Sequence, residues 1–156
     1  MAFHIEHRIG IQAPARVIWA NLYDLSTWSE WNPLYPQAEG RIALGETLKL
    51  TLALPGEAPR QIAPRVQDWE PDAQIVWRLQ FAPMLGHSVR YIEIEALSET
   101  GCVVNNGEFF HGMVGERLGQ SKRRPIRDGF QALSEALKAR AEAQWRSSVE
   151  SGIQQP

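Results

Sequence analysis

The chain has almost no cysteine, no long apolar run and no excess of one charge. Its single cysteine, Cys102, excludes an internal disulfide, which is typical of a reducing compartment, so we expect a cytoplasmic protein. No stretch approaches the roughly 20 consecutive apolar residues of a membrane-spanning helix, so no membrane insertion is expected. The first residues, MAFHIEHRIGIQ, alternate apolar with polar side chains and lack the apolar region of a secretory signal.

Charge and motif content argue against several further classes of function. The chain has 16 Lys and Arg against 18 Asp and Glu, a net charge of −2, whereas a nucleic-acid-binding domain is usually strongly basic. Its 4 histidines, at positions 4, 7, 87 and 111, show no metal-ligand spacing with each other or with the cysteine. Neither a phosphate-binding glycine loop nor a nucleophile elbow occurs. We therefore expect no nucleic-acid partner, no metal and no cofactor.

What the sequence does contain is the composition of one globular domain. A length of 156 residues with 44% hydrophobic residues suits a single core. We place the domain at residues 1–146 and expect the polar segment 147–156 to be a flexible tail.

Periodicity predicts the order of the secondary structure. Residues 3–11 alternate as a half-buried strand does, and two short helical segments follow, the first beginning near Pro14. Short strand-like runs, the first of them GRIAL, then continue to residue 111, separated by turn sequences such as LPGEAP and EPDA. One of them, RQIAPRVQDW, predicts a single weak strand because it contains Pro64. Consecutive short strands followed by a helix predict an antiparallel sheet in an α+β fold.

The C-terminal segment has helical periodicity. Ile126, Phe130, Leu133 and Leu137 form one apolar stripe, so we expect a long helix that packs this stripe on the inner face of the sheet. Pro125 interrupts the pattern, and a proline inside a helix costs about 3 kcal/mol. We therefore expect a short helix, a kink at Pro125 and then the long helix.

Six segments carry a family resemblance: IQAPARVIWANLYDLSTWSEWNP (11–33), GETLKLTL (45–52), VQDWEPDAQIVWR (66–78), RYIEIEAL (90–97), GEFFHG (107–112) and GFQALSEALKARAE (129–142). Their order and spacing over almost the whole chain resemble the SRPBCC or START-like superfamily, particularly its polyketide cyclase/dehydrase and lipid-transport group. The resemblance implies a helix-grip fold, in which a curved antiparallel sheet of about seven strands surrounds the long C-terminal helix and two short helices follow the first strand. It also implies an elongated cavity between the sheet and that helix.

The segment NNGEFFHG, residues 105–112, combines polar groups with aromatic rings and is central to any functional hypothesis. By the family pattern Glu108 faces inward beside Arg90 of the preceding strand. Because a buried carboxylate needs a partner or takes up a proton, we expect the two to pair, either as a structural unit or as part of a ligand site. They are also weak catalytic candidates. The side chains expected to bind the ligand are Trp31, Leu52, Trp77, Leu79, Arg90, Ile92, Ile94, Asn106, Glu108, Phe110, Phe130 and Leu133.

These features favour the binding of a hydrophobic or amphipathic small molecule, lipid-like or polyketide-like, by a protein that need not be an enzyme. One alternative is a polyketide cyclase or dehydratase using the same cavity, with Glu108 and Arg90 steering proton transfer. A second is a co-chaperone-like interaction module, which a long exposed apolar patch on the outer face of the sheet would favour. A homodimer is left open. For the basic run SKRRPIR (121–127), a solvated helix face is favoured over contact with an anionic lipid or ligand.

Overall fold

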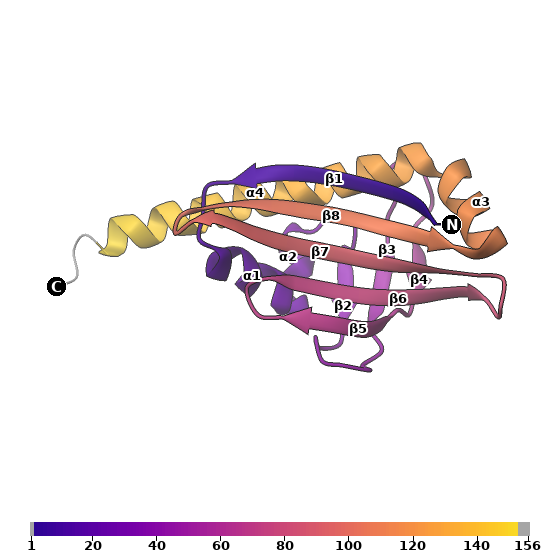
Figure 1. The fold of residues 1–156 in the computed structure, drawn as a ribbon. Coiled ribbons are helices and arrows are strands. Elements are labelled where there is room, and N and C mark those ends of the chain that lie inside the picture. Colours follow the sequence, from indigo (N-terminus) through magenta and orange to yellow (C-terminus); the bar gives the residue numbers. More distant parts are fainter. Residues whose placement is uncertain (1, 153–156) are drawn as a thin grey trace.

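A computed structural model describes residues 2–152, which form two antiparallel sheets, short helices and a long C-terminal helix (Figure 1). The elements are β1 (Phe3–Ile11), α1 (Ala15–Tyr23), the 3-10 helix η1 (Leu25–Thr27), α2 (Trp28–Trp31), β2 (Gln37–Glu39), β3 (Lys49–Leu52), β4 (Arg60–Ile62), β5 (Arg65–Glu70), β6 (Gln74–Ala82), β7 (Gly86–Ser98), β8 (Gly101–His111), α3 (Gly112–Ser121) and α4 (Arg123–Gly152).

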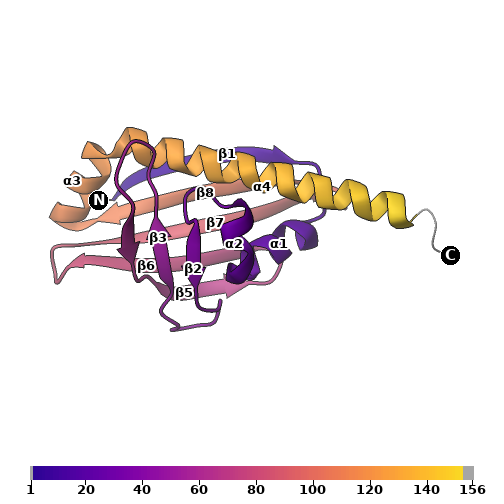
Figure 2. The same ribbon diagram turned by 180° about the vertical axis from the view of Figure 1, so that it is seen from behind.

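The larger sheet has five strands in the order β1-β8-β7-β6-β5, and the smaller one has three in the order β2-β3-β4. Every paired neighbour is antiparallel, and the first strand pairs with the last along its whole length, from Phe3 opposite Phe110 to Ile11 opposite Cys102. A bridge between Thr47 and Arg65 connects the two sheets. Figure 2 shows α4, the small sheet and the short helices on the same face of the large sheet. The predicted α+β arrangement is confirmed.

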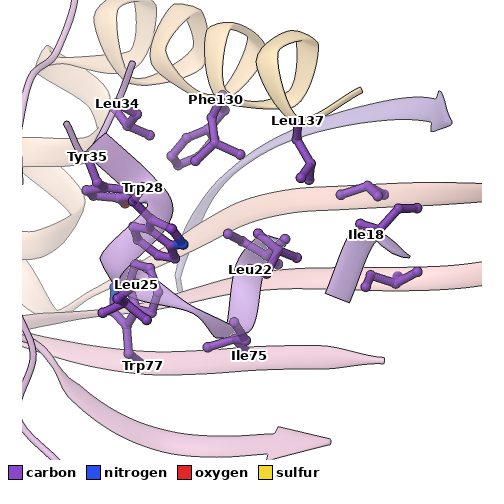
Figure 3. Packing of buried hydrophobic residues seen from close by; sticks show 14 of the residues in the cluster. Ile18, Leu22, Leu25, Trp28, Leu34, Tyr35, Ile75, Trp77, Phe130 and Leu137 are labelled. Carbon is purple, nitrogen blue, oxygen red and sulfur yellow. The ribbon is translucent and has the colours of Figure 1, made fainter. Parts of the chain in front are cut away.

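The core lies between this covered face and α4. The predicted stripe on α4 is buried: Ile126, Phe130, Leu133 and Leu137 are all at most 5% exposed. Figure 3 shows Phe130 and Leu137 pointing from α4 toward buried side chains of the short helices, among them Trp28. The helix therefore contributes most of its apolar face to a single core, as an amphipathic helix on a sheet does.

The helices differ from the sequence prediction in two details. The helices divide at Lys122, so Pro125 does not kink a helix but lies in the first turn of α4, where a backbone N–H has no intrahelical acceptor and proline is tolerated. Helix α4 continues past residue 146 to Gly152, and residues 153–156 lie outside the described part.

The strands between residues 37 and 70 are also arranged differently. GRIAL forms no strand, whereas the short segment Gln37–Glu39 does. The segment expected to be one weak strand forms two, β4 and β5, which separate at Pro64 because proline has no N–H to donate to a ladder.

Candidate functional site

Strands β7 and β8 place two charged side chains opposite each other on the inner face of the large sheet. Arg90 is the direct register partner of Glu108. The inward parity predicted for these strands is confirmed, since Arg90, Ile92 and Asn106 are completely buried and Phe110 is 2% exposed. A guanidinium and a carboxyl are therefore held inside an otherwise apolar layer.

The guanidinium of Arg90 has fewer partners than its donors require. Its Nε donates to the hydroxyl of Tyr35 at 3.0 Å, and its Nη1 donates to the carbonyl oxygens of Tyr91 at 2.8 Å and Gly107 at 3.1 Å. The charge also lies over the ring of Phe130, 4.2 Å from its centroid. Nη2, however, is buried and has no acceptor among the described residues. A buried charged donor without a partner is costly, so this nitrogen is an open position in the site.

Glu108 does not form the contact ion pair that the sequence predicted. No nitrogen of Arg90 lies within 4.0 Å of its carboxylate, although the two residues are neighbours across the strands. Burial raises the pKa of Glu108; the charge of Arg90, the Ser88 hydroxyl and Arg60 oppose that rise without reversing it. The Ser88 hydroxyl is completely buried near the carboxyl but lacks hydrogen-bond geometry to any described group. Glu108 therefore tends to take up a proton.

The partly exposed side chain of Glu108 faces a small cavity of about 30 Å³. That volume admits one or two waters, roughly tenfold less than the 300 Å³ at the lower end of ligand pockets. An ion pair between Lys122 Nζ and Glu57, 2.7 Å long, connects the α3–α4 junction to the loop between β3 and β4 beside this cavity. The cavity is lined by Tyr35, Leu52, Leu54, Arg60, Ile62, Trp77, Leu79, Phe81, Glu108, Phe110, Leu118, Lys122, Ile126 and Phe130.

Six of the side chains expected to bind a ligand lie around this cavity: Leu52, Trp77, Leu79, Glu108, Phe110 and Phe130. Arg90 is buried behind it, and Ile92, Ile94 and Leu133 belong to the solid core. Asn106 joins β8 to α4, because its Nδ2 donates to the carbonyl of Phe130 at 2.9 Å and to Ser134 Oγ at 3.2 Å, while its Oδ1 is buried without a partner among the described residues. Trp31 packs edge-on against Trp28, outside the cavity lining.

Two polar residues of the cavity, Tyr35 and Arg60, were missed from the sequence, and a third, Lys122, belongs to the basic run for which a solvated helix face was favoured. Tyr35 follows α2 in the sequence PLYPQ, where flanking prolines impose extended backbone and no periodicity reveals which way the ring points. Figure 3 shows Tyr35, Trp77 and Phe130 converging from three segments far apart in the sequence: the loop after α2, strand β6 and helix α4. One general rule could have pointed to Tyr35: a buried tyrosine hydroxyl needs a hydrogen-bond partner, and in the structure that partner is Arg90.

The outer face of the same strands carries a second polar cluster. The hydroxyl of Tyr91 donates to the carboxylate of Glu6 and accepts from His4 Nε2 at 2.6 Å. Burial, followed by the bond to Glu6, raises the pKa of Tyr91, so the phenol stays protonated.

Between residues 2 and 152 there is no group of three or more His, Cys, Asp or Glu side chains that could hold a metal ion. None of the helices in that range is both long and apolar enough to span a membrane.

Solved structures with this fold include proteins of several kinds. Norcoclaurine synthase from Thalictrum flavum, in complex with dopamine and hydroxybenzaldehyde, is 15% identical with a TM-score of 0.67, over 89% of this chain and 86% of that one. The Zhui aromatase/cyclase from Streptomyces sp. R1128 is 22% identical with a TM-score of 0.64, over 87% and 94%. A START superfamily protein from Mycobacterium smegmatis is 17% identical with a TM-score of 0.65, over 90% and 98%. The search of curated proteins found no significant match.

The shared architecture defines a START-like helix-grip protein: an antiparallel sheet curved around a long C-terminal helix, with polar groups inside. The family model described as "Polyketide cyclase / dehydrase and lipid transport" matches residues 2–142. This chain therefore belongs to that family, and the resemblance inferred from its sequence segments is confirmed.

Proposed function

We propose that this protein binds a small molecule with an apolar body and one polar end in the cavity between the large sheet, the β3–β4 segment and α4. The observation that supports this most directly is the incomplete pairing of Arg90 and Glu108 beside an apolar cavity. A hydroxyl or carbonyl group on a ligand would supply the hydrogen bonds that the protein itself omits, while the surrounding rings would cover the apolar body. Such a ligand is lipid-like or polyketide-like.

Binding a molecule of that size requires the cavity to open, because 30 Å³ is too small. Leu52, Leu54 and Ile62 reach the cavity from the β3–β4 segment, which forms part of a three-stranded sheet rather than of the large one. Outward movement of this segment would enlarge the cavity and would separate Lys122 from Glu57. The ion pair is half-exposed, so its rupture has a modest cost, typically below about 1 kcal/mol.

The test is native mass spectrometry of freshly purified protein, followed by titration with a fluorescent apolar probe. A co-purifying small molecule, or saturable probe binding, is expected. Phe110→Ala should weaken probe binding more than Glu108→Gln, because it removes apolar wall area worth roughly 25 cal/mol per Å². Leu97→Ala, a change at an exposed position outside the cavity, is the control. Absence of both a bound molecule and saturable probe binding would contradict the proposal.

A second candidate function is acid–base catalysis on a polyketide-like substrate. The sequence offered one acid–base group, Glu108, but the structure adds the hydroxyl of Tyr35, which also lines the cavity. Burial raises the pKa of Tyr35, and because its oxygen accepts from Arg90, its own proton remains free to be donated. A protonated phenol beside a carboxyl of raised pKa is a donor and acceptor pair of the kind that proton transfer needs.

Turnover distinguishes the two candidates. If a polyketide-like substrate is converted, Glu108→Gln and Tyr35→Phe should each slow conversion about a hundredfold or more. Absence of conversion by native protein would leave the binding function alone, and conversion at equal rates by native protein and both variants would exclude Glu108 and Tyr35 as the acid–base groups. The interaction-module alternative has little support: among the exposed large apolar side chains of residues 2–152, only Leu97 lies in the paired strands of the large sheet. A cytoplasmic location and a homodimer stay predictions.

A further inference from the structure

Exposed apolar side chains gather at one end of the molecule. Of the eight large hydrophobic residues that are exposed in the described chain, four belong to the turn between β6 and β7 and to the start of α3. These are Met84, Leu85, Met113 and Val114, with Met84 fully exposed and Met113 77% exposed. We call these four residues the apolar tip. In Figure 1 the β6–β7 turn and α3 lie together at the end opposite the C-terminus.

Backbone contacts hold the two segments of the apolar tip in a fixed arrangement. The backbone N–H of Val114 donates to the carbonyl of Leu85 at 2.9 Å, joining the turn to α3. Gly86 and Gly115 are packed so closely that a Cβ on Gly86 would lie 2.6 Å from the backbone nitrogen of Gly115. The two segments are thus fixed against each other, and their apolar side chains point to solvent as one surface.

Folding alone does not account for the residue at the centre of this surface. Met84 has a φ of 64°, a left-handed conformation that glycine or asparagine usually adopts in turns. A long apolar side chain is unfavourable there, and this one makes no buried contact in return because it is fully exposed. A methionine held in this conformation, with its side chain in solvent, indicates a role in contact with something outside the molecule.

The charges next to the apolar tip indicate what that contact is. Residues 112–127 carry five cationic side chains and one carboxylate, although the whole chain has a net charge of −2. Lys122 is neutralised by Glu57, but the exposed side chains of Arg117, Arg123 and Arg124 make no ion pair with any described residue. Helix α3 begins with Met113 and Val114 of the apolar tip and carries Arg117, and Arg123 and Arg124 begin the next helix, α4.

We propose that this end of the molecule docks on an anionic lipid surface. The four apolar side chains enter the interface between headgroups and acyl chains, and the arginines of α3 and of the start of α4 bind the lipid phosphates. Leu118 on the same helix and Phe81 at the end of β6 line the internal cavity, so docking places that cavity next to the membrane. Contact of this kind goes beyond the sequence prediction, which favoured a solvated helix face for the basic run.

Vesicle sedimentation with the full chain tests the proposal. Native protein should bind vesicles of phosphatidylcholine mixed with phosphatidylglycerol, and should bind pure phosphatidylcholine much more weakly. Met84→Asn combined with Met113→Gln should weaken binding by at least about tenfold, because two apolar anchors are lost. Arg123→Gln combined with Arg124→Gln should weaken binding to the anionic vesicles by about fivefold per arginine, and added salt should have the same effect.

Two controls keep the result interpretable. Leu97→Asn changes a side chain that is 67% exposed at the opposite end of β7 and should leave vesicle binding unchanged. Met84→Asn should not lower the thermal stability, since asparagine suits the left-handed conformation better.

Absence of binding to anionic vesicles, or equal binding by the methionine variants and native protein, overturns the proposal. So does conversion of a dimer to a monomer by Met84→Asn without an effect on vesicles, which would make the apolar tip a self-association surface. Vesicle binding needs no cavity ligand, so this outcome is independent of the binding function proposed above.

Discussion

Strands β7 and β8 carry a tyrosine-centred polar cluster on each face, and the two clusters differ in how completely they are paired. On the outer face the hydroxyl of Tyr91 is bonded to both Glu6 and His4, and its ring lies across Gly107. On the inner face Tyr35 accepts from Arg90, whose Nη2 remains unpartnered, and the carboxyl of Glu108 has no contact ion pair.

The two clusters differ in whether the protein itself satisfies their polar groups, and the proposed binding function assigns the unsatisfied groups of the inner cluster to a ligand. Water can reach the outer cluster, so any lost bond there is replaced at low cost, yet the protein completes its bonds. In the inner cluster Arg90 is completely buried and Glu108 only partly exposed, and an unmet donor costs most where the surroundings are dry. Incomplete pairing on the inner face therefore makes the folded protein less stable than complete pairing would. Such a loss of stability is expected at a functional site.

The largest expected effect concerns the support of the inner cluster. Phe130→Ala removes the ring that packs on the guanidinium of Arg90 and fills the core beneath α4. The free energy of unfolding should fall by roughly 3 to 5 kcal/mol. Urea denaturation measures it. A loss below about 1 kcal/mol, the usual range for surface changes, would contradict the placement of this ring in the core.

The next effect concerns the outer cluster. A Cβ on Gly107 would lie 2.3 Å from the Tyr91 hydroxyl and 2.9 Å from the carbonyl oxygen of Ile5. Gly107→Ala should therefore displace the Tyr91 ring and destabilise by roughly 1 to 3 kcal/mol, as overpacking does. Thermal unfolding gives the size of the effect. Combining Gly107→Ala with Tyr91→Ala should recover part of the loss; strictly additive losses would show that the ring is not the obstacle.

Removing one hydroxyl from each cluster compares them directly. Tyr35→Phe leaves Nε of a completely buried arginine without its acceptor, so it should cost about 1 to 3 kcal/mol. Tyr91→Phe leaves His4 and Glu6 exposed to water and should cost at most about 1 kcal/mol. Chemical denaturation of the two variants in parallel is the measurement. Equal costs would remove the distinction between the clusters.

How much of this was predictable from the sequence depends on the range of the interactions. Strand alternation placed Arg90 on the inner face, and helical period placed Phe130 in the core, because both signals are local. The inward position of Glu108 came from the family resemblance. The residues that complete the site come from elsewhere. Tyr35 and Lys122 lie in irregular segments, where direction depends on tertiary packing.

The distance between two charged groups likewise does not follow from the pairing register of their strands. The family pattern predicted that Glu108 lies beside Arg90 and pairs with it, but the guanidinium instead turns to Tyr35 and to two backbone carbonyls, which leaves the carboxyl to the cavity. The position of the helix break also depended on context. Proline is a helix breaker only in the interior, and the chain starts α4 early enough to keep Pro125 in the first turn.

The smallest expected effect is the contribution of Glu108 to the pH dependence of the free energy of unfolding. Because burial raises the pKa of Glu108 above its unfolded value, the folded state binds more protons than the unfolded state between those two values. The stability tied to this group is thus fully present below the unfolded pKa and is lost as the pH rises through the folded pKa. Glu108→Gln removes that dependence, so the variant should be more stable than native protein at neutral pH and should lose this advantage below about pH 4, near the unfolded pKa.

A matched carboxylate with the opposite shift makes the comparison decisive. At Glu142 partial burial raises the pKa, but hydrogen bonds from Lys138 and from the backbone N–H of Gln12 outweigh it, so the pKa is lowered. Its stability contribution is therefore present above the unfolded pKa and disappears as the pH falls through the folded one. Glu142→Gln should destabilise the protein at neutral pH and have little effect in acid. Unfolding free energies for both variants across this pH range should diverge from native protein in opposite directions. If both curves shift the same way, Glu108 is paired like an ordinary surface carboxylate, and the inner cluster is no more open than the outer one.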